Sequence, residues 1–194
     1  MKIPTTSFDA EARAASDRLV KRAEREGLLD VAYAVVESPL GPLVAATTPR
    51  GLARLAYGEE ERVLEELART VSPRILQAPT RLNAVRRQLD QYFAGRRREF
   101  DLDVDLALVH GFSRRVLRAT ARIPFGDVRT YAQVASRAGS PRASRAAGNA
   151  LGANPVPIVV PCHRVVHSGG GLGGYTGGLD RKEYLLALEG VIER

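Results

Sequence analysis

The stretch that most constrains the fold is TYAQVASRAGSPRASRAAGNALGAN, residues 130–154. Thr130 and Gln133 have the spacing of a capping box, so we expect a helix to follow Thr130 and to break at Gly139. Ser140 is then expected to cap a second helix that has a proline at its first position. Two short helices joined by a tight Gly-Ser turn predict a helix-turn-helix.

The second of these helices is unusual for an element that reads bases. Its side chains are mostly Ala and Gly, and Arg142, Arg145 and Asn149 follow at spacings of three and four, roughly along one side. Small residues allow a close backbone approach but offer few donors for the major-groove edges of bases. Two interpretations stay open here: DNA binding with little sequence preference, or a small-residue helix packed inside the domain.

The charge of the chain is distributed unevenly. Residues 1–105 carry 17 Lys and Arg against 17 Asp and Glu, whereas residues 106–194 carry 12 against 5, so the net charge of +7 lies in the second part. This asymmetry is compatible with a polyanionic partner and equally with a solvated basic face. Most of the excess is arginine, which favours bidentate contact with phosphate.

Hydrophobic periodicity organises the rest of the chain into an α+β arrangement. An N-terminal helical extension (1–30) precedes a small α/β domain (31–107) with a three-stranded antiparallel sheet, and a helical domain (108–194) follows. The expected elements are a helix over 8–27 ended by Gly27, three strands within 31–58, helices over 59–71 and 79–95, a strand or linker over 97–108, and a helix from 111 that Pro124 stops.

Cys162 is the only cysteine of the chain. It follows PVPIVVP, whose prolines are expected to hold the backbone extended and to present the thiol from a stiff, mostly buried segment. A free cysteine in such a setting is usually an inert small hydrophobe, and a nucleophile is the alternative. One cysteine and three histidines exclude an internal disulfide and a cysteine-rich zinc site.

A base and a carboxylate can be assigned to this thiol. His163 is adjacent, but neighbouring side chains point apart, so a bridging water is a more natural proton link than a direct hydrogen bond. Such a base matters because the thiolate is the nucleophilic form. Glu189 ends a helix that Asp180 is expected to cap and Gly190 to stop. It is either turned inward behind the imidazole or an exposed charge that the helix dipole disfavours.

The glycine-rich segment GGGLGGYTGG, residues 169–178, contains a G-x-G-x-x-G match. No helix is expected to open there and no βαβ unit surrounds it, so the sequence does not favour a dinucleotide site. A loop that carries Tyr175 and Thr176 and closes over a flat ligand fits better.

These residues together resemble a known family. NPVPIVVPCHRVVHSGGGLGGYTGG followed by KEYLLALEG closely resembles the active-site region of the O6-alkylguanine-DNA alkyltransferases, the methylated-DNA–protein-cysteine methyltransferases. IPFGDVRTYAQVASRAGSPRASRAAGNALGANP is similar to their helix-turn-helix, and QLDQYFAGRRREFDL to their domain junction. The resemblance is strong over 111–190, and residues 1–30 resemble nothing identified. It implies a ribonuclease-H-like N-terminal domain and a C-terminal winged helix-turn-helix.

The resemblance also implies roles for individual residues. Cys162 would accept the alkyl group from a flipped-out base, with His163 as the water-mediated base and Glu189 as the carboxylate that orients it. Asn154 would fix the turn that carries the cysteine, and Tyr131 would donate a hydrogen bond to the leaving base.

The remaining implied residues bind the base or the DNA. The carbonyls of Cys162 and Val165 would accept from the exocyclic amine of guanine, the Thr176 amide would assist Tyr131, and Arg145 would fill the gap left by the flipped base. The substrate pocket would further contain Tyr175 and Leu151, and the DNA surface Thr130, Arg142, Ala143, Ser144 and Asn149.

The activity implied is direct-reversal DNA repair in a single turnover per molecule. The alkyl group would come from O6-alkylguanine, and also from O4-alkylthymine, in double-stranded DNA bound through its minor groove with little sequence preference. No cofactor is required and no structural metal is expected. A monomer is expected, with cooperative assembly on DNA left open.

Two alternatives and a location complete the expectations. A non-catalytic protein that binds alkylated DNA would share the fold but lack the cysteine, and a cysteine hydrolase would use Cys162, His163 and Glu189. The chain shows no apolar signal region at its start and no run approaching the ~18 apolar residues of a membrane span. A cytoplasmic protein is therefore predicted.

Overall fold

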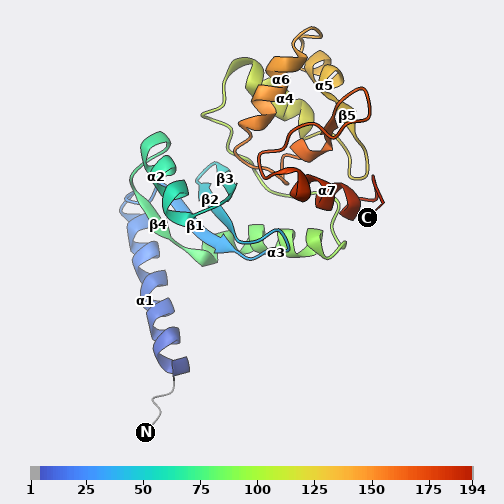
Figure 1. Ribbon diagram of the computed structural model, residues 1–194. Coiled ribbons are helices and arrows are strands. Elements are labelled where there is room, and N and C mark those ends of the chain that lie inside the picture. Colours follow the sequence, from blue (N-terminus) through green and yellow to red (C-terminus); the bar gives the residue numbers. More distant parts are fainter. Residues whose placement is uncertain (1–4, 194) are drawn as a thin grey trace.

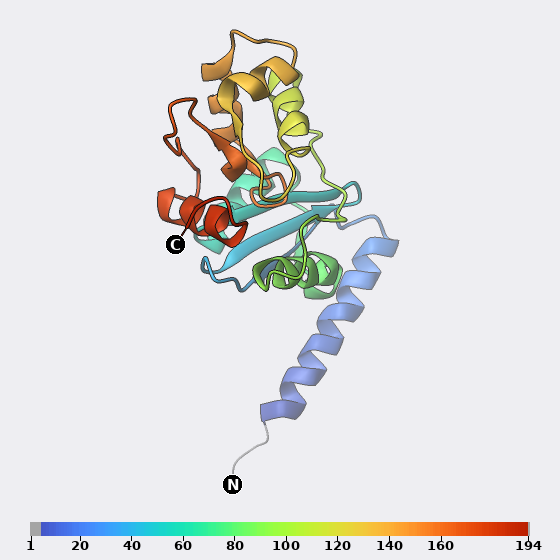
Figure 2. The same ribbon diagram turned by 90° about the vertical axis from the view of Figure 1, so that its right-hand side faces the viewer.

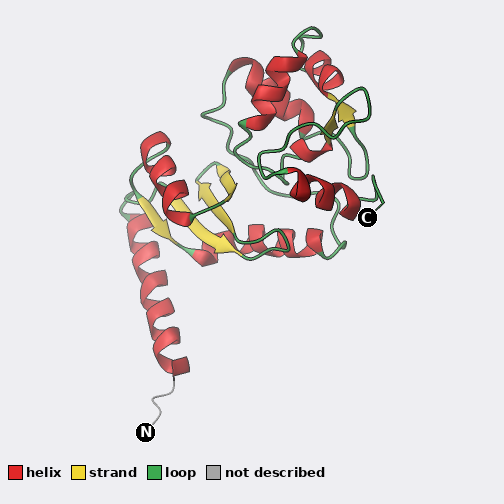
Figure 3. Cartoon of the chain, in the orientation of Figure 1, coloured by secondary structure: helices red, strands yellow, loops and turns green. Residues whose placement is uncertain are grey.

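The computed structural model describes residues 5–193, which form an N-terminal part built around a sheet and a C-terminal part built mainly of helices (Figure 1). Figure 3 shows the same division: the larger sheet lies entirely in the N-terminal part, and helices and loops dominate the C-terminal part. The predicted α+β fold is confirmed. Between residues 5 and 193, no helix is long and apolar enough to cross a membrane.

Helix α1 (Thr5–Arg25) projects away from the rest of the chain (Figures 1 and 2). Its C-terminal end joins the body of the protein, where Val20 and Ala23 are buried. Gly27 has a φ of +67°, and beyond it Leu28 N–H donates to the Ala23 carbonyl at 2.8 Å. This is the helix stop that glycine provides. The predicted extension is therefore helical, although the helix begins at Thr5 and ends two residues before the glycine.

The larger sheet contains the three predicted antiparallel strands, β1 (Val31–Val36), β2 (Leu43–Thr48) and β3 (Gly51–Tyr57). A fourth strand, β4 (Ile75–Gln77), pairs parallel with β1 and gives the order β3-β2-β1-β4. β4 was not predicted, because three residues are too few to display an alternating pattern.

Successive residues of the strands face opposite layers. Val44 is buried in one cluster with residues of α2 (Glu60–Thr70), whereas Leu43 is buried with residues of α3 (Asn83–Phe93). The predicted helix over 79–95 begins as a short 3-10 helix, η1 (Pro79–Leu82), before α3. Figure 2 shows α3 beneath the sheet, on the side opposite the C-terminal part.

The segment between α3 and the C-terminal part is a linker attached to the edge of the sheet. Leu52 of β3 donates its N–H to the Asp103 carbonyl at 2.8 Å and accepts from Asp105 N–H at 2.9 Å, around an isolated bridge to Val104. Another part of the same strand contacts the segment that precedes Cys162, because Leu55 N–H donates to the Pro155 carbonyl at 2.9 Å. The edge of β3 therefore connects the two parts of the chain.

The C-terminal part contains α4 (Gly111–Thr120), α5 (Tyr131–Arg137) and α6 (Ser144–Gly152). The predicted capping box of α5 is present: Gln133 N–H donates to Thr130 Oγ1 at 3.2 Å, and Thr130 N–H donates to Gln133 Oε1 at 2.8 Å. α5 ends before Gly139, which has a φ of +82°. These features confirm the first half of the helix-turn-helix.

The predicted start of the second helix is wrong. Residues Ser140 to Ala143 form a turn in which Ala143 N–H donates to the Ser140 carbonyl at 3.0 Å, and α6 begins only at Ser144. Pro141 occupies the second position of this turn, where proline is favoured, and proline is also favoured in the first turn of a helix. Arg142 therefore precedes the helix instead of lying along its side.

The last elements return to the helix-turn-helix. β5 (Arg129–Thr130) pairs parallel with β6 (Val165–Val166), and α7 (Leu179–Leu188) follows the glycine-rich loop. The predicted cap at Asp180 is wrong, since Gly178 precedes the helix and Asp180 lies inside its first turn. An acidic residue there still interacts favourably with the helix dipole.

Candidate active site

Cys162 begins a 3-10 turn, η2 (Cys162–Arg164), in the interior of the C-terminal part. The residues before it form compact turns, with Val160 N–H donating to the Val156 carbonyl at 2.9 Å, so the predicted extended run is wrong. The prolines restrict their own φ angles, but Ile158 between them takes a φ of +72° and reverses the chain. The segment is nevertheless buried, as expected.

Asn154 holds these turns together from inside. Its Nδ2 donates to the Val160 carbonyl at 2.8 Å and to Cys162 Sγ at 3.2 Å, and its Oδ1 accepts from Val156 N–H at 3.0 Å. The side chain is only 5% exposed. One amide thus fixes both the shape of the segment and the position of the sulfur.

His163 and Glu189 form a buried pair behind the cysteine. His163 Nε2 lies 3.0 Å from Glu189 Oε1, and neither side chain is exposed to solvent. Glu189 is therefore turned inward, at the C-terminal end of α7, as one of the two alternatives required. The other ring nitrogen, His163 Nδ1, is buried and has no hydrogen-bond partner within the described chain.

Glu189 accepts hydrogen bonds from three further groups that sequence analysis did not assign. Arg164 grips the carboxylate with both Nε (2.9 Å to Oε2) and Nη2 (2.8 Å to Oε1). The Tyr92 hydroxyl donates to Oε1 at 2.6 Å, and Gly126 N–H approaches Oε2 at 3.4 Å. A buried charge needs such partners. Arg164 lies among apolar residues in the sequence, and this position could have indicated a buried arginine that is paired with a carboxylate.

The protonation states follow from these contacts. Burial by itself raises the pKa of Glu189, but the hydrogen bonds from His163 and Arg164 outweigh it and hold the pKa at about 2. Burial lowers the pKa of His163. The imidazole is therefore neutral at pH 7, and because its Nε2 faces an ionised carboxylate it must donate there. Nδ1 is then the free acceptor, which is the nitrogen a base requires.

The resting cysteine is a thiol. Burial raises the pKa of Cys162 to about 11, although the hydrogen bond from Asn154 and the charge of Lys182 act in the opposite direction. At neutral pH the sulfur must therefore lose its proton during a reaction rather than before it. The unpartnered Nδ1 of the adjacent imidazole is a basic atom that could receive this proton.

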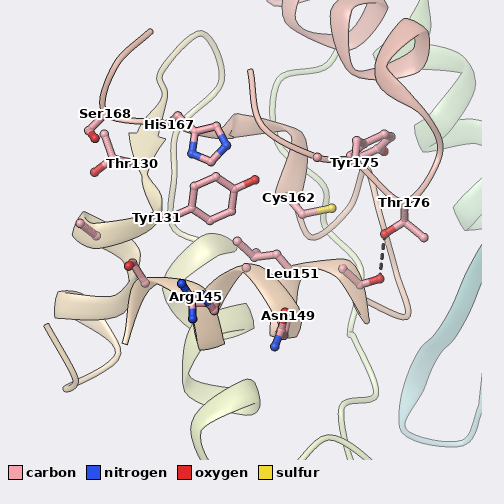
Figure 4. Close-up of a pocket in the computed structure, with 15 residues that line it drawn as sticks. Thr130, Tyr131, Arg145, Asn149, Leu151, Cys162, His167, Ser168, Tyr175 and Thr176 are labelled. Atoms are coloured by element: carbon pink, nitrogen blue, oxygen red, sulfur yellow. Dashed lines mark hydrogen bonds between the residues drawn. The ribbon is translucent and has the colours of Figure 1, made fainter. Parts of the chain in front are cut away.

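A pocket of about 710 Å³ opens beside the sulfur (Figure 4). Tyr131 projects into it from the start of α5, beneath the His167 ring at 5.1 Å between centroids. Burial raises the pKa of Tyr131, so its hydroxyl stays protonated and able to donate. The pocket also brings together most other predicted residues: Thr130, Ser144, Arg145, Asn149, Leu151, Cys162, Tyr175 and Thr176.

The predicted residues outside this pocket have other places. Asn154, His163 and Glu189 lie behind the cysteine in the interior, and Val165 is fully buried in β6. The DNA-surface candidates other than Thr130 line a second, open hollow of about 530 Å³ at the start of α6, which is lined by Arg142, Ala143, Ser144, Arg145, Ala146 and Asn149. Ser144, Arg145 and Asn149 belong to both hollows, so the two adjoin across α6.

Lys182 anchors the glycine-rich loop from below. Its fully buried Nζ donates to the Val165 carbonyl at 2.6 Å and also to the carbonyls of Leu172 and Gly174. Burial lowers the pKa of Lys182 to about 8. One lone pair of the Val165 carbonyl is thus already occupied, and the predicted contact with a base must use the other. No feature of the sequence distinguished this lysine.

Tyr175 and Thr176 connect the loop to its surroundings. The Tyr175 hydroxyl lies 3.0 Å from the Tyr57 hydroxyl of β3, so the N-terminal part touches a residue that lines the pocket. The guanidinium of Arg181 covers the Tyr57 ring at 4.6 Å. Thr176 Oγ1 donates to the Gly152 carbonyl at 2.8 Å and joins the loop to the end of α6 (Figure 4).

Comparison with known proteins identifies the family to which this arrangement belongs. Residues 31–106 match the family model described as 6-O-methylguanine DNA methyltransferase, ribonuclease-like domain, and residues 111–191 match the DNA binding domain of the same family. The methylated-DNA–protein-cysteine methyltransferase of Mycolicibacterium paratuberculosis is 43% identical over 82% of this chain and 92% of that protein. The chain belongs to the methylated-DNA–protein-cysteine methyltransferase family.

Other members of this methyltransferase family show the same relationship. The protein of that name from Methanosarcina acetivorans is 39% identical over 81% of this chain and 97% of its own length. The O6-methylguanine methyltransferase of Mycobacterium tuberculosis matches with a TM-score of 0.69 and 39% identity, covering 82% of this chain and 92% of that chain. OGT of the same organism in complex with DNA matches with a TM-score of 0.70 and 40% identity over 81% and 92%.

Proposed function

We propose that this protein repairs alkylated DNA by moving an alkyl group from O6 of guanine to the sulfur of Cys162. The observation that carries the proposal is the thiol itself, which borders a pocket beside α6 and has an unpartnered imidazole nitrogen on the adjacent residue. Membership of the methyltransferase family supports the same reaction.

The reaction balances with the groups that the site contains. The proton of the Cys162 thiol passes, through a bridging water, to His163 Nδ1, whose other nitrogen donates to ionised Glu189. The sulfur then attacks the alkyl carbon, so that a carbon–sulfur bond forms as the carbon–O6 bond breaks. The electron pair of the broken bond goes to the guanine, where the Tyr131 hydroxyl donates a hydrogen bond to the developing negative charge.

The environment of the thiol explains why such a reaction would be confined to a bound base. A thiol with a pKa of about 11 is a poor nucleophile in the free protein. A base that fills the pocket excludes water and sets the alkyl carbon in line with the sulfur. We propose that Tyr175 and Leu151 contact the faces of this base, and that the carbonyls of Cys162 and Val165 and the Thr176 amide contact its edges.

The DNA would be held by the start of α6. Family membership and the DNA complex of a relative support DNA as the partner, and we propose that this DNA is double-stranded. We propose that α6 lies in the minor groove with little sequence preference, that Arg145 fills the space left by the flipped base, and that Arg142, Ala143, Ser144, Asn149 and Thr130 contact the backbone. A flipped base costs a few kcal/mol, which these contacts offset.

The thioether that forms is stable, so one molecule would repair one lesion. We propose that O4-alkylthymine is a second substrate, that the protein acts as a monomer, and that the DNA can hold several copies side by side. A cytoplasmic location agrees with the need for a reduced thiol at Cys162. A non-catalytic lesion-binding protein is disfavoured because it would have no use for this thiol.

A stoichiometric transfer assay tests the proposal. The protein is incubated with excess duplex containing O6-methylguanine and then digested, and the mass of the peptide that contains Cys162 is measured by mass spectrometry. We expect the mass of one methyl group on that peptide, a limit of one equivalent per molecule, and no transfer by Cys162→Ser. Tight binding without a mass change would indicate the lesion-binding alternative, and turnover beyond one equivalent would indicate a hydrolase.

A further inference from the structure

A second basic surface lies on residues of α4 and α5 that do not line the pocket. Four arginines line a surface hollow of about 470 Å³: Arg115 and Arg118 of α4, Arg122 just after it, and Arg137 at the end of α5. The fifth lining residue is Ala119, so no acidic side chain borders the hollow. We call these four residues the α4 arginine cluster.

The cluster follows from helical spacing. Arg115, Arg118 and Arg122 are separated by three and four residues, which places them along one side of α4 and its continuation. The opposite side of the helix packs into the core through Val116 and Leu117. The arginines are therefore directed outward, and all four are exposed.

Most guanidinium groups of the α4 arginine cluster make no polar interaction within the described part of the protein. Arg115 Nε donates to the Ala138 carbonyl at 2.8 Å and so caps the end of α5. In contrast, the side chains of Arg118, Arg122 and Arg137 have no hydrogen bond or ion pair with any group in the part of the chain whose side chains the structure describes. Three neighbouring guanidinium groups without partners do not stabilise the folded protein, because like charges repel one another. They would attract a partner of negative charge.

The position of the cluster relates it to the DNA surface. α5 begins with Tyr131 in the pocket and ends with Arg137 in the cluster, a distance of roughly 9 Å along the helix at 1.5 Å per residue. The turn after α5 carries Arg142, which lines the hollow at the start of α6. Along the chain, Arg137, Arg142 and Arg145 therefore follow one another from the end of α5 to the start of α6, and α4 packs against both of these helices (Figure 1).

We infer that the α4 arginine cluster binds phosphates of the same DNA duplex, beyond the nucleotides that contact α6. This inference rests on the proposed function, because it takes the DNA held at α6 as its partner. Guanidinium groups bind phosphate oxygens in a bidentate manner, whatever the base sequence. The cluster would strengthen binding to damaged and undamaged DNA equally and would leave the chemistry at Cys162 unchanged.

The test compares two matched pairs of substitutions. Arg118→Glu with Arg122→Glu reverses two charges of the cluster, and Arg62→Glu with Arg69→Glu makes the same change on exposed positions of α2. A third protein, Arg118→Gln with Arg122→Gln, removes the charges without adding repulsion. Binding to an undamaged duplex that extends well beyond the pocket is measured by fluorescence anisotropy at several salt concentrations.

We expect the Gln pair to reduce the slope of log affinity against log salt by about 2, because each neutralised phosphate contributes about 0.9. The Glu pair should weaken binding further, and the α2 pair should leave the slope unchanged. Equal slopes for the Gln pair and the wild type would overturn the inference. A change in self-association with unchanged DNA binding would assign the cluster to a protein contact instead, and would also overturn it.

The two proposals fail in different ways. Alkyl transfer from the free base O6-benzylguanine involves no phosphate, so the cluster variants should react with it at the wild-type rate. If the wild type transfers no alkyl group from any substrate, the proposed function is wrong, yet the anisotropy comparison still decides the role of the cluster. If transfer occurs and the salt slopes are equal, only the cluster inference is wrong.

Discussion

The Tyr92 hydroxyl donates a hydrogen bond of 2.6 Å to Glu189 Oε1, although the two residues are 97 positions apart in the chain. Tyr92 belongs to α3, in the N-terminal part, and Glu189 ends α7. Burial and the adjacent carboxylate raise the pKa of Tyr92, so its hydroxyl stays protonated and can donate at neutral pH. The ribonuclease-like domain thus contributes directly to the charge behind His163.

Replacing Tyr92 by Phe should weaken this arrangement without abolishing it. The change removes one donor from a buried carboxylate, which costs on the order of 2 kcal/mol of unfolding free energy, while Arg164 and His163 keep their bonds. We expect slower alkyl transfer with unchanged affinity for DNA. Urea unfolding and single-turnover rates measure the two effects. Tyr33→Phe, which removes a hydroxyl bonded to Glu60 far from the pocket, is the control and should leave the rate unchanged.

The raised pKa of Cys162 predicts an unusual reactivity profile. With a pKa of about 11, the thiolate fraction of the folded protein rises about tenfold for each pH unit from neutral pH upward. The rate of modification by iodoacetamide should rise in parallel and should show no plateau near pH 8.5. The same protein unfolded in urea provides the control, because its cysteine should reach a plateau at the ordinary thiol pKa of about 8.5. A plateau at the same pH in both states would contradict the assignment.

Local signals in the sequence predicted the elements that local interactions decide. The capping box of Thr130 and Gln133 is complete within four residues, and the structure contains it. Ser140 was misassigned because its neighbour Pro141 fits the second position of a turn as well as the first turn of a helix. The run before Cys162 was wrongly predicted to be extended. Its prolines favour extended backbone, but the positive φ of Ile158 is enough to reverse the direction of the chain.

The site residues that belong to a local sequence motif could be predicted, whereas those that reach the site from distant parts of the chain could not. Cys162, His163 and Glu189 were recognisable from their local sequence, and the structure brings them within one region. Tyr92 and Lys182 act through tertiary contacts with groups far away in the chain, and no periodicity encodes such contacts. The four arginines around α4 were visible only as part of a net charge, since charge alone does not place residues side by side.

Two neighbouring glycines of the glycine-rich loop test whether close packing against Tyr131 matters for alkyl transfer, because an added Cβ would collide with Tyr131 at only one of them. Gly173 has a φ of +72°, and a Cβ there would lie 2.5 Å from the Tyr131 hydroxyl oxygen. Gly173→Ala should therefore displace the Tyr131 ring and slow alkyl transfer on the order of 10- to 100-fold. Gly174 has no atom within 4 Å of an added Cβ, and its φ lies outside the left-handed region. Gly174→Ala should transfer at nearly the wild-type rate, and equal defects in both variants would contradict this account.

The lowered pKa of Glu189 predicts a specific loss of stability in acid. Because its folded pKa of about 2 lies below the ordinary value of 4.5, the group contributes stability that is complete above pH 4.5 and is lost as the pH falls toward 2. The shift corresponds to on the order of 3 kcal/mol. Urea unfolding at a series of pH values should show this decline. Tyr92→Phe removes a donor to Glu189 and should raise the pKa of this carboxylate in the folded protein. The unfolding free energy of the variant should therefore fall by a smaller amount, over a narrower pH range that begins to matter at higher pH. An identical acid profile for the two proteins would mean that the hydroxyl does not stabilise the charge.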